Sequence, residues 1–179
     1  MPDARTLLKA TPRTPLEVAY IQKLLRGQTL SPVRSLPTRT YPLGRPFSVT
    51  TPWNVRGSNP PWSLERHTGE DYACPDGMRV VATRWGRVEW VGTYGGWSSS
   101  GSYGLHIIWR TADGKLDAGV CHLSSARVRV GQSLRPGTLL GLSGHSGNVS
   151  GSHVHHEVRP AGGRFGSDVN PRLVRRKAA

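Results

Sequence analysis

Residues 105–124 read LHIIWRTADGKLDAGVCHLS, and this stretch indicates the fold class. Two β-prone runs, 105–110 and 120–123, lie on either side of Asp113-Gly114, a dipeptide typical of tight hairpin turns. Similar short runs occur along the middle of the chain, at Arg79–Thr83, Gly86–Gly92, Arg127–Val130, Thr138–Leu142 and Val154–Arg159. Runs this short, separated by glycine turns and not by long helices, predict an all-β, mainly antiparallel domain.

The predicted domain spans residues 47–160 and has flanks of different composition. Residues 1–46 are rich in proline, threonine and arginine, a composition that resists compact packing. Within them, Thr14 supplies a helix N-cap, Pro15 the first helical position and Glu17 a capping side chain. Apolar residues then recur on one face, so a short amphipathic helix is predicted over about 15–26. Residues 161–179 are predicted to be a basic tail.

The net charge of +13 lies mainly in the two ends of the chain. Residues 1–47 carry 8 basic and 2 acidic side chains, and residues 159–179 carry 6 and 1. Such ends attract polyanions, including anionic wall polymers of bacteria, or are solvated tails without a partner. No nucleic-acid-binding motif, transmembrane segment or secretory signal is recognisable, so specific nucleic-acid binding is not expected.

Two histidine segments have spacings that a metal site can use. In a straight strand, His67 and Asp71 would lie about 13 Å apart, so the backbone must bend, most easily at Gly69, if both bind one metal. A strand over 153–157 places His153 and His155 on one face. From spacing alone, these two histidines are equal candidates for a metal ligand.

These segments, together with the lone histidine of Cys121-His122-Leu123-Ser124, resemble the lysostaphin-type family of peptidoglycan metalloendopeptidases, the LytM domain. The matching features, in family order over about residues 45–160, are His67-x-Gly69-x-Asp71, Tyr72-Ala73, Val80-Val81-Ala82, His122-Leu123-Ser124, Val130-Gly131-Gln132, Gly137, Gly141, Gly144, Gly147, Gly151 and His153-x-His155-x-Glu157.

The resemblance implies a LytM-like β-sheet domain with an active-site groove and one zinc ion per chain. It implies that His67, Asp71 and His155 bind the zinc, and that His122 and His153 are catalytic. The activity that it implies is hydrolysis of amide bonds in the peptide part of bacterial cell-wall peptidoglycan.

Some positions depart from the family pattern. His156 stands where members usually carry an aromatic or apolar residue, and Val120 stands where a tyrosine often precedes the central His-Leu-Ser. Strand alternation predicts that both side chains point away from the metal. The upstream tyrosine that stabilises the oxyanion in some members is missing, and only Trp53 and Trp62 are found there, so that role is unassigned.

The two cysteines, Cys74 and Cys121, are also predicted by alternation to lie away from the metal, either paired or as free thiols with a structural role.

Four residues are candidates for contact with substrate. Trp97 and Tyr103 flank a serine-rich loop, and His145 and Asn148 lie in the glycine-rich approach to the last histidines. His106 is instead predicted to be a structural strand residue.

The absence of a signal peptide and of a separate wall-binding module suggests a phage endolysin or a virion-associated lysin. Such an enzyme is made in the host cytoplasm and reaches the wall through a holin or with the particle. The alternatives are a structural or targeting component of a virion or division complex with the same fold, and a non-catalytic binder of wall polyanions. The complete set of five metal-site residues favours the enzyme.

Overall fold

The computed structural model describes residues 40–56 and 66–172. Over these residues the chain forms an antiparallel β-sheet, which confirms the predicted all-β class, and no helix occurs in either range. The strands are β1 (Glu70–Ala73), β2 (Arg79–Val81), β3 (Gly86–Gly92), β4 (Leu105–Thr111), β5 (Leu116–Ala126), β6 (Ser133–Leu134), β7 (Leu139–Ser143) and β8 (His153–Pro160). The helix predicted over about 15–26 lies outside the described residues.

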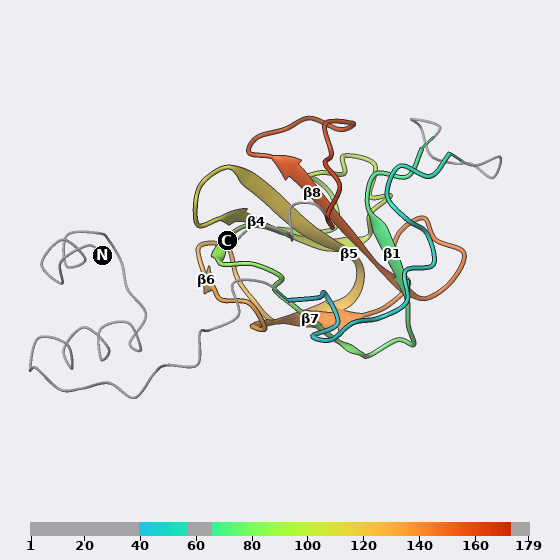
Figure 1. Ribbon diagram of the computed structural model, residues 1–179. Helices are drawn as coiled ribbons and strands as arrows, with labels where there is room; N and C mark the ends of the chain where they lie inside the picture. The colour runs from blue at the N-terminus through green and yellow to red at the C-terminus, as the bar shows by residue number, and fades with distance from the viewer. Residues whose placement is uncertain (1–39, 57–65, 173–179) are drawn as a thin grey trace, which may run out of the picture. The chain divides into compact units, whose positions relative to one another are not determined.

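The sheet follows the order β1-β8-β5-β4-β3-β6, and β7 joins β5 to β2 (Figure 1). Strand β5 is central because its first half pairs with β8 and β4, whereas its last residues pair with β7. Strand β8, which carries His153 and His155, therefore lies between β1, which carries Asp71, and β5, which carries His122.

The predicted hairpin at Asp113-Gly114 is confirmed. Strands β4 and β5 pair on either side of it, and Gly114 has a φ of 71°, which glycine adopts without strain. The Oγ1 atom of Thr111 donates a hydrogen bond of 2.6 Å to the Asp113 carboxylate and closes the turn.

The strand predicted over Arg127–Val130 is wrong. Strand β5 ends at Ala126, and the chain then turns, with the Gln132 amide donating to the Arg129 carbonyl oxygen and Gly131 in the left-handed region. Val128 packs against the core, but Val130 is exposed, so the apolar alternation does not continue past Val128. Residues 127–131 therefore lead from the end of β5 into a turn and do not form a separate strand.

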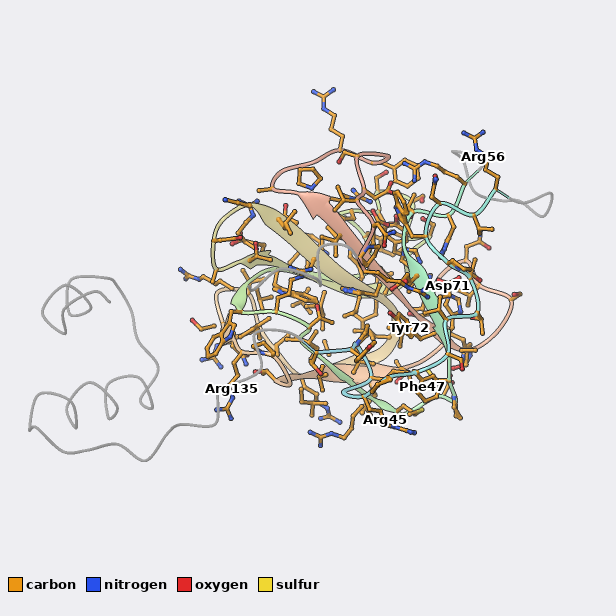
Figure 2. All side chains as sticks on the ribbon, viewed as in Figure 1. Arg45, Phe47, Arg56, Asp71, Tyr72 and Arg135 are labelled. Atoms are coloured by element: carbon orange, nitrogen blue, oxygen red, sulfur yellow. The ribbon has the colours of Figure 1, made fainter. Side chains whose placement is uncertain are left out.

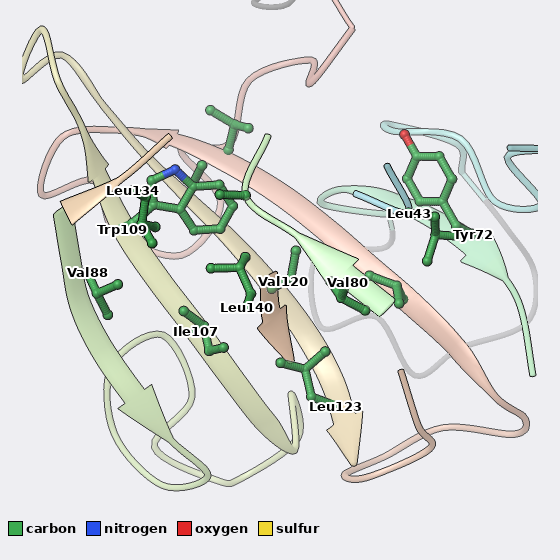
Figure 3. Close-up of a cluster of buried hydrophobic side chains, with 14 of the residues drawn as sticks. Leu43, Tyr72, Val80, Val88, Ile107, Trp109, Val120, Leu123, Leu134 and Leu140 are labelled. Atoms are coloured by element: carbon green, nitrogen blue, oxygen red, sulfur yellow. The ribbon is translucent and has the colours of Figure 1, made fainter. Parts of the chain in front are cut away.

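A cluster of buried apolar side chains fills the space between the strands (Figure 3). Its largest buried members include Trp109, Tyr72, Ile107, Leu123 and Leu140. Beside Trp109, the ring of His156 stacks nearly parallel at a centroid distance of 6.2 Å, and its Nδ1 lies 2.8 Å from the Gly119 carbonyl oxygen. The departure from the family pattern at His156 is thus accommodated by packing and by polar contacts with Gly119 and Thr83.

The segment that follows β8 remains in contact with the domain through Arg172. The Val169 amide donates to the Val158 carbonyl oxygen, and the buried Asp168 carboxylate accepts hydrogen bonds of 2.6 Å from both Trp53 and Arg66. These contacts extend past residue 160, where the composition alone places the end of the domain. In the ranges that the structure describes, no helix has the length and apolar character that crossing a membrane requires.

Candidate metal centre

The three predicted metal ligands come together on one face of the sheet. His67 Nε2 lies 3.1 Å from Asp71 Oδ1 and 3.1 Å from His155 Nδ1, and the latter two atoms are 2.9 Å apart. In four-coordinate zinc sites, bonds of about 2.0–2.1 Å place the donor atoms about 3.3 Å from one another. The donor set of two imidazoles and one carboxylate therefore fits a single ion of this kind.

The bend predicted between the first two ligands is produced at Gly69. A Cβ atom at this position would collide with the carbonyl oxygen of His156 and with the ring of His155. The chain then enters β1, which carries Asp71 (Figure 2), and Asp71 is directly opposite His155 on β8. A residue with a side chain at 69 would push the two ligand segments apart.

A short ribbon orients the His67 ring. The Asn54 amide donates to the His67 carbonyl oxygen, and the His67 amide donates to the Val55 carbonyl oxygen. The ring Nδ1 lies 3.1 Å from the Pro52 carbonyl oxygen, which can only accept, so Nδ1 carries the proton. The Nε2 lone pair is thereby left for the metal, as in other sites where a backbone carbonyl fixes the ligand tautomer.

The opposite edge of the His155 ring contacts a second carboxylate. Its Nε2 lies 3.2 Å from Glu157 Oε2, whereas its Nδ1 faces Asp71. Burial alone would lower the pKa of His155, but the hydrogen bonds to Asp71 and Glu157 raise it to about 9. Burial would likewise raise the pKa of Asp71, yet the close contacts with the His155 and His67 rings hold it well below its usual range. The carboxylate is therefore ionised and ready to bind a cation.

The two predicted catalytic histidines lie next to each other beside the ligands. The ring centroids of His122 and His153 are 4.6 Å apart, and His153 Nε2 is 3.7 Å from Asp71 Oδ1. Each ring holds its Nδ1 2.9 Å from a backbone carbonyl oxygen, that of Ser146 for His122 and that of Gly151 for His153. In its neutral form, a ring with the proton on Nδ1 keeps an Nε2 lone pair that can accept a proton.

Burial sets the protonation of His122. It lowers the pKa of this ring to about 3, with further lowering from the neighbouring His155 and His153. His122 is therefore neutral at neutral pH, as a proton acceptor must be.

The expectation that Cys121 lies away from the metal is wrong. Cys121 is paired with His155 across β5 and β8, and directly paired residues of an antiparallel sheet share a face. The next residue, His122, has a φ of 64°, which breaks the strand alternation and lets both side chains point to the same side. Cys121 and Cys74 are both buried free thiols, and burial raises the pKa of each.

Tyr103 is the candidate substrate residue that lies closest to the ligands. Its ring stacks on His155 at a centroid distance of 5.6 Å, and its hydroxyl donates to Glu157 over 2.7 Å. Burial and the charge of Glu157 raise the pKa of this hydroxyl far above its usual value, so Tyr103 is neutral.

The other three candidates have contacts of their own. The Trp97 ring lies under the guanidinium of Arg159 at 4.2 Å. His145 is exposed and pairs with Asp76 at 2.6 Å, and the amide of the exposed Asn148 donates to the Ser102 carbonyl oxygen. Contact of these residues with substrate stays a prediction. His106 is fully buried, as expected for a structural residue, with Nδ1 2.9 Å from the Gly104 carbonyl oxygen.

Sequence reasoning assigned no role to Glu157, although one signal was available. Glu157 follows His155 by two positions in β8, so alternation places both side chains on the metal face. Its carboxylate is fully buried there and lies against Thr68 and Tyr103 as well as His155.

Comparison with known proteins agrees with this geometry. The profile of Peptidase family M23 matches residues 65–171, which include all five histidine and aspartate residues of the site. The chain belongs to peptidase family M23. It is 36% identical over 110 residues to the DD-carboxypeptidase/endopeptidase Mpg of Neisseria meningitidis serogroup B, an alignment that covers 62% of this chain and 22% of Mpg.

Two solved structures have the same fold. The catalytic domain of lysostaphin from Staphylococcus simulans has a TM-score of 0.64 at 22% identity and covers 73% of this chain and 93% of its own. A variant of the catalytic domain of the prophage-encoded M23 protein EnpA from Enterococcus faecalis has a TM-score of 0.59 at 32% identity, covering 75% and 95%. The chain spans about a quarter of the length of the curated relatives, 26% and 22% for the first two.

Proposed function

We propose that this M23 chain is a zinc-dependent endopeptidase that hydrolyses amide bonds in the peptide part of bacterial cell-wall peptidoglycan. The observation that carries the proposal is the cluster of His67, Asp71 and His155, whose donor atoms lie 2.9–3.1 Å apart. Three protein ligands leave the fourth position of a tetrahedral zinc open, which is the arrangement of catalytic rather than structural sites.

The residues around the cluster match the needs of amide hydrolysis. When bound, zinc supplies a water whose pKa is lowered toward about 7 and a Lewis acid for the scissile carbonyl. His153, with Nε2 3.7 Å from a ligand oxygen, can take a proton from the attacking water and return it to the leaving amine. The neutral His122 ring beside it can accept the same proton or orient the water.

The substrate class is supported by relatives. Mpg is named a DD-carboxypeptidase/endopeptidase, and ShyA of Vibrio cholerae, 26% identical over 125 residues, is named a peptidoglycan DD-endopeptidase. Lysostaphin is described as an antimicrobial peptidase. A chain of family M23 with the complete five-residue set is expected to act on the polymer named for ShyA, peptidoglycan.

The zinc assignment is tested by metal content and hydrolysis together. We expect the purified wild type to bind one zinc per chain and to release soluble muropeptides from cell walls, with a chelator abolishing the release. Because His155 is a ligand, His155→Ala is expected to bind far less zinc. Wild type without zinc, or undiminished zinc in His155→Ala, would contradict the assignment.

The catalytic assignment needs a variant that keeps the metal. His153→Ala removes a proton-transfer group but none of the three ligands, so we expect bound zinc with hydrolysis lowered by about 10²–10⁴-fold. Full activity in this variant refutes the role of His153. A structural or targeting component, or a binder of wall polyanions, instead predicts wall binding that a chelator does not change and no muropeptide release.

Phage origin and delivery of the chain by a holin or a virion stay predictions from the sequence, as does binding of anionic wall polymers by the basic ends. Mass spectrometry of muropeptides released from several wall types identifies the bond that is cut.

A further inference from the structure

One buried carboxylate, that of Glu157, lies behind the metal ligands. Its side chain has no exposed area, and both carboxylate oxygens accept hydrogen bonds. Oε2 accepts hydrogen bonds of 2.7 Å from Thr68 and 2.7 Å from Tyr103 and lies 3.2 Å from His155 Nε2. Oε1 accepts a hydrogen bond of 2.5 Å from Arg159. Because four donors surround it, the carboxylate has one fixed orientation.

This orientation selects the ligating edge of His155. An ionised carboxylate can only accept hydrogen bonds, so the facing Nε2 must carry a proton. To bind a metal the ring must give up one of its protons, and the proton on Nε2 is the one that Glu157 holds in place. Nδ1, which lies within 3.1 Å of the donor atoms of Asp71 and His67, is therefore the nitrogen that would supply a lone pair to the metal. The opposite tautomer would set a lone pair against a buried anion, which is costly in a site of low dielectric.

The same carboxylate connects the ligand to its neighbours. Tyr103, which donates to Glu157, also stacks on the His155 ring, and Thr68 directly follows the ligand His67. Arg159 balances the charge of Glu157, and its second nitrogen donates to the Tyr103 hydroxyl over 3.2 Å. Glu157 therefore contacts the edge of the His155 ring, and Tyr103, which is hydrogen-bonded to Glu157, packs on its face.

We propose that Glu157 is a positioning residue that fixes His155 for metal binding through Nδ1 and holds Tyr103 against the ligand ring. The inference rests on the proposed zinc site and assigns it a residue outside the five histidine and aspartate positions. Glu157 itself touches neither metal nor substrate in this role.

The substitution Glu157→Gln tests the role at nearly constant volume. A glutamine amide must place its NH₂ group either toward His155, where it favours the wrong tautomer, or toward Arg159, where two donors meet. Loss of such a partner of a metal-ligating histidine typically weakens metal affinity by about 10–100-fold. We therefore expect the zinc dissociation constant of the variant, measured by competition with a chelator, to rise by about that factor.

Glu70→Gln is the matched control. Glu70 is also a buried carboxylate, and it accepts hydrogen bonds from Tyr72 and Arg172, on the strand that carries Asp71. Neither of these two partners is a metal ligand, so this variant is expected to lose stability while keeping the zinc affinity of wild type. A purely structural role for Glu157 predicts the same behaviour in both variants.

A second measurement uses the wild type alone and so stays decisive if Glu157→Gln does not fold. In the zinc-loaded protein with ¹⁵N-labelled histidine, nuclear magnetic resonance should show His155 protonated at Nε2 and coordinated through Nδ1. Coordination through Nε2, or wild-type zinc affinity in Glu157→Gln, overturns the inference. If instead the wild type binds no zinc, the proposed function itself fails, and the two failures are thus distinguishable.

Discussion

At the scale of single residues, the backbone of His122 is the most unusual feature of the site. Its φ of 64° lies in the left-handed region, where a side chain costs roughly 1–2 kcal/mol, and only Asn54 shares this property among the described non-glycine residues. The conformation is compensated on both sides, since the His122 amide donates to the Tyr103 carbonyl oxygen and Nδ1 faces the Ser146 carbonyl oxygen. The strain thus serves to turn the ring toward the ligands.

This strain predicts an inverted order of stability for two variants that both lack the ring. Glycine in a strand is usually less stable than alanine by about 0.5–1 kcal/mol. At position 122 the left-handed backbone favours glycine. We therefore expect the free energy of unfolding of His122→Gly, measured by denaturant titration, to exceed that of His122→Ala by about 1 kcal/mol. Ser124, in the same strand, is the control, and Ala should be the more stable replacement there. The same order at both positions would contradict the interpretation.

The same residue marks where sequence reasoning stops. Alternation along β8 correctly placed His153 and His155 on one face, because that strand is regular, and the structure pairs them with Ala73 and Asp71. Alternation along β5 failed at Cys121, because one left-handed residue shifts which side chains share a face. Nothing in the local sequence reveals that conformation, since it depends on long-range partners. The bend at Gly69, by contrast, was predictable because two ligands of one ion required it.

At the scale of elements, two loops without regular structure pack against each other and orient the proposed catalytic His122. The Ser146 Oγ accepts a hydrogen bond of 2.9 Å from the Leu105 amide and donates one of 2.8 Å to the Leu123 carbonyl oxygen. Gly104 lies directly against Ser146, so the loop before β4 and the loop before β8 are packed backbone to backbone. Because the Ser146 carbonyl oxygen lies 2.9 Å from His122 Nδ1, the packing of the two loops fixes the group that orients the His122 ring.

The loop contact predicts a variant that separates catalysis from metal binding. A Cβ atom on Gly104 would overlap the backbone of Ser146 and displace the carbonyl that orients His122. A displacement of about 1 Å can cost about 100-fold in rate, so Gly104→Ala is expected to lose about that much hydrolysis while retaining zinc. Gly114→Ala is matched in backbone strain, with a φ of 71° against 57°, but has open space around the new methyl group. It should keep the wild-type rate, and equal losses in both variants would refute the loop argument.

At the scale of the whole molecule, the segment after β8 contacts the two segments that carry the proposed ligands His67 and Asp71. The only acidic residue in the strongly basic stretch 159–179 is Asp168, and its side chain is completely buried against Arg66 and Trp53. Arg66 directly precedes the ligand His67, and Arg172 pairs with Glu70, the residue before the ligand Asp71. Composition could not reveal this arrangement, because it registers the charge of a segment and not which of its members is buried.

These contacts predict where the domain can be shortened. A chain ending after Arg172 keeps both ion pairs, whereas a chain ending after Pro160 leaves the buried Glu70 carboxylate without its arginine and removes Asp168. Breaking a buried pair costs about 3–5 kcal/mol, a large part of the 5–15 kcal/mol by which domains are typically stable. We expect thermal unfolding of the shorter chain at a temperature lower by about 10 °C or more, and weaker zinc binding, because the segment that carries the proposed ligand His67 loses the contact between Arg66 and Asp168. Equal unfolding temperatures and equal zinc affinity for the two truncated chains would instead place the end of the domain at 160, as composition alone suggests.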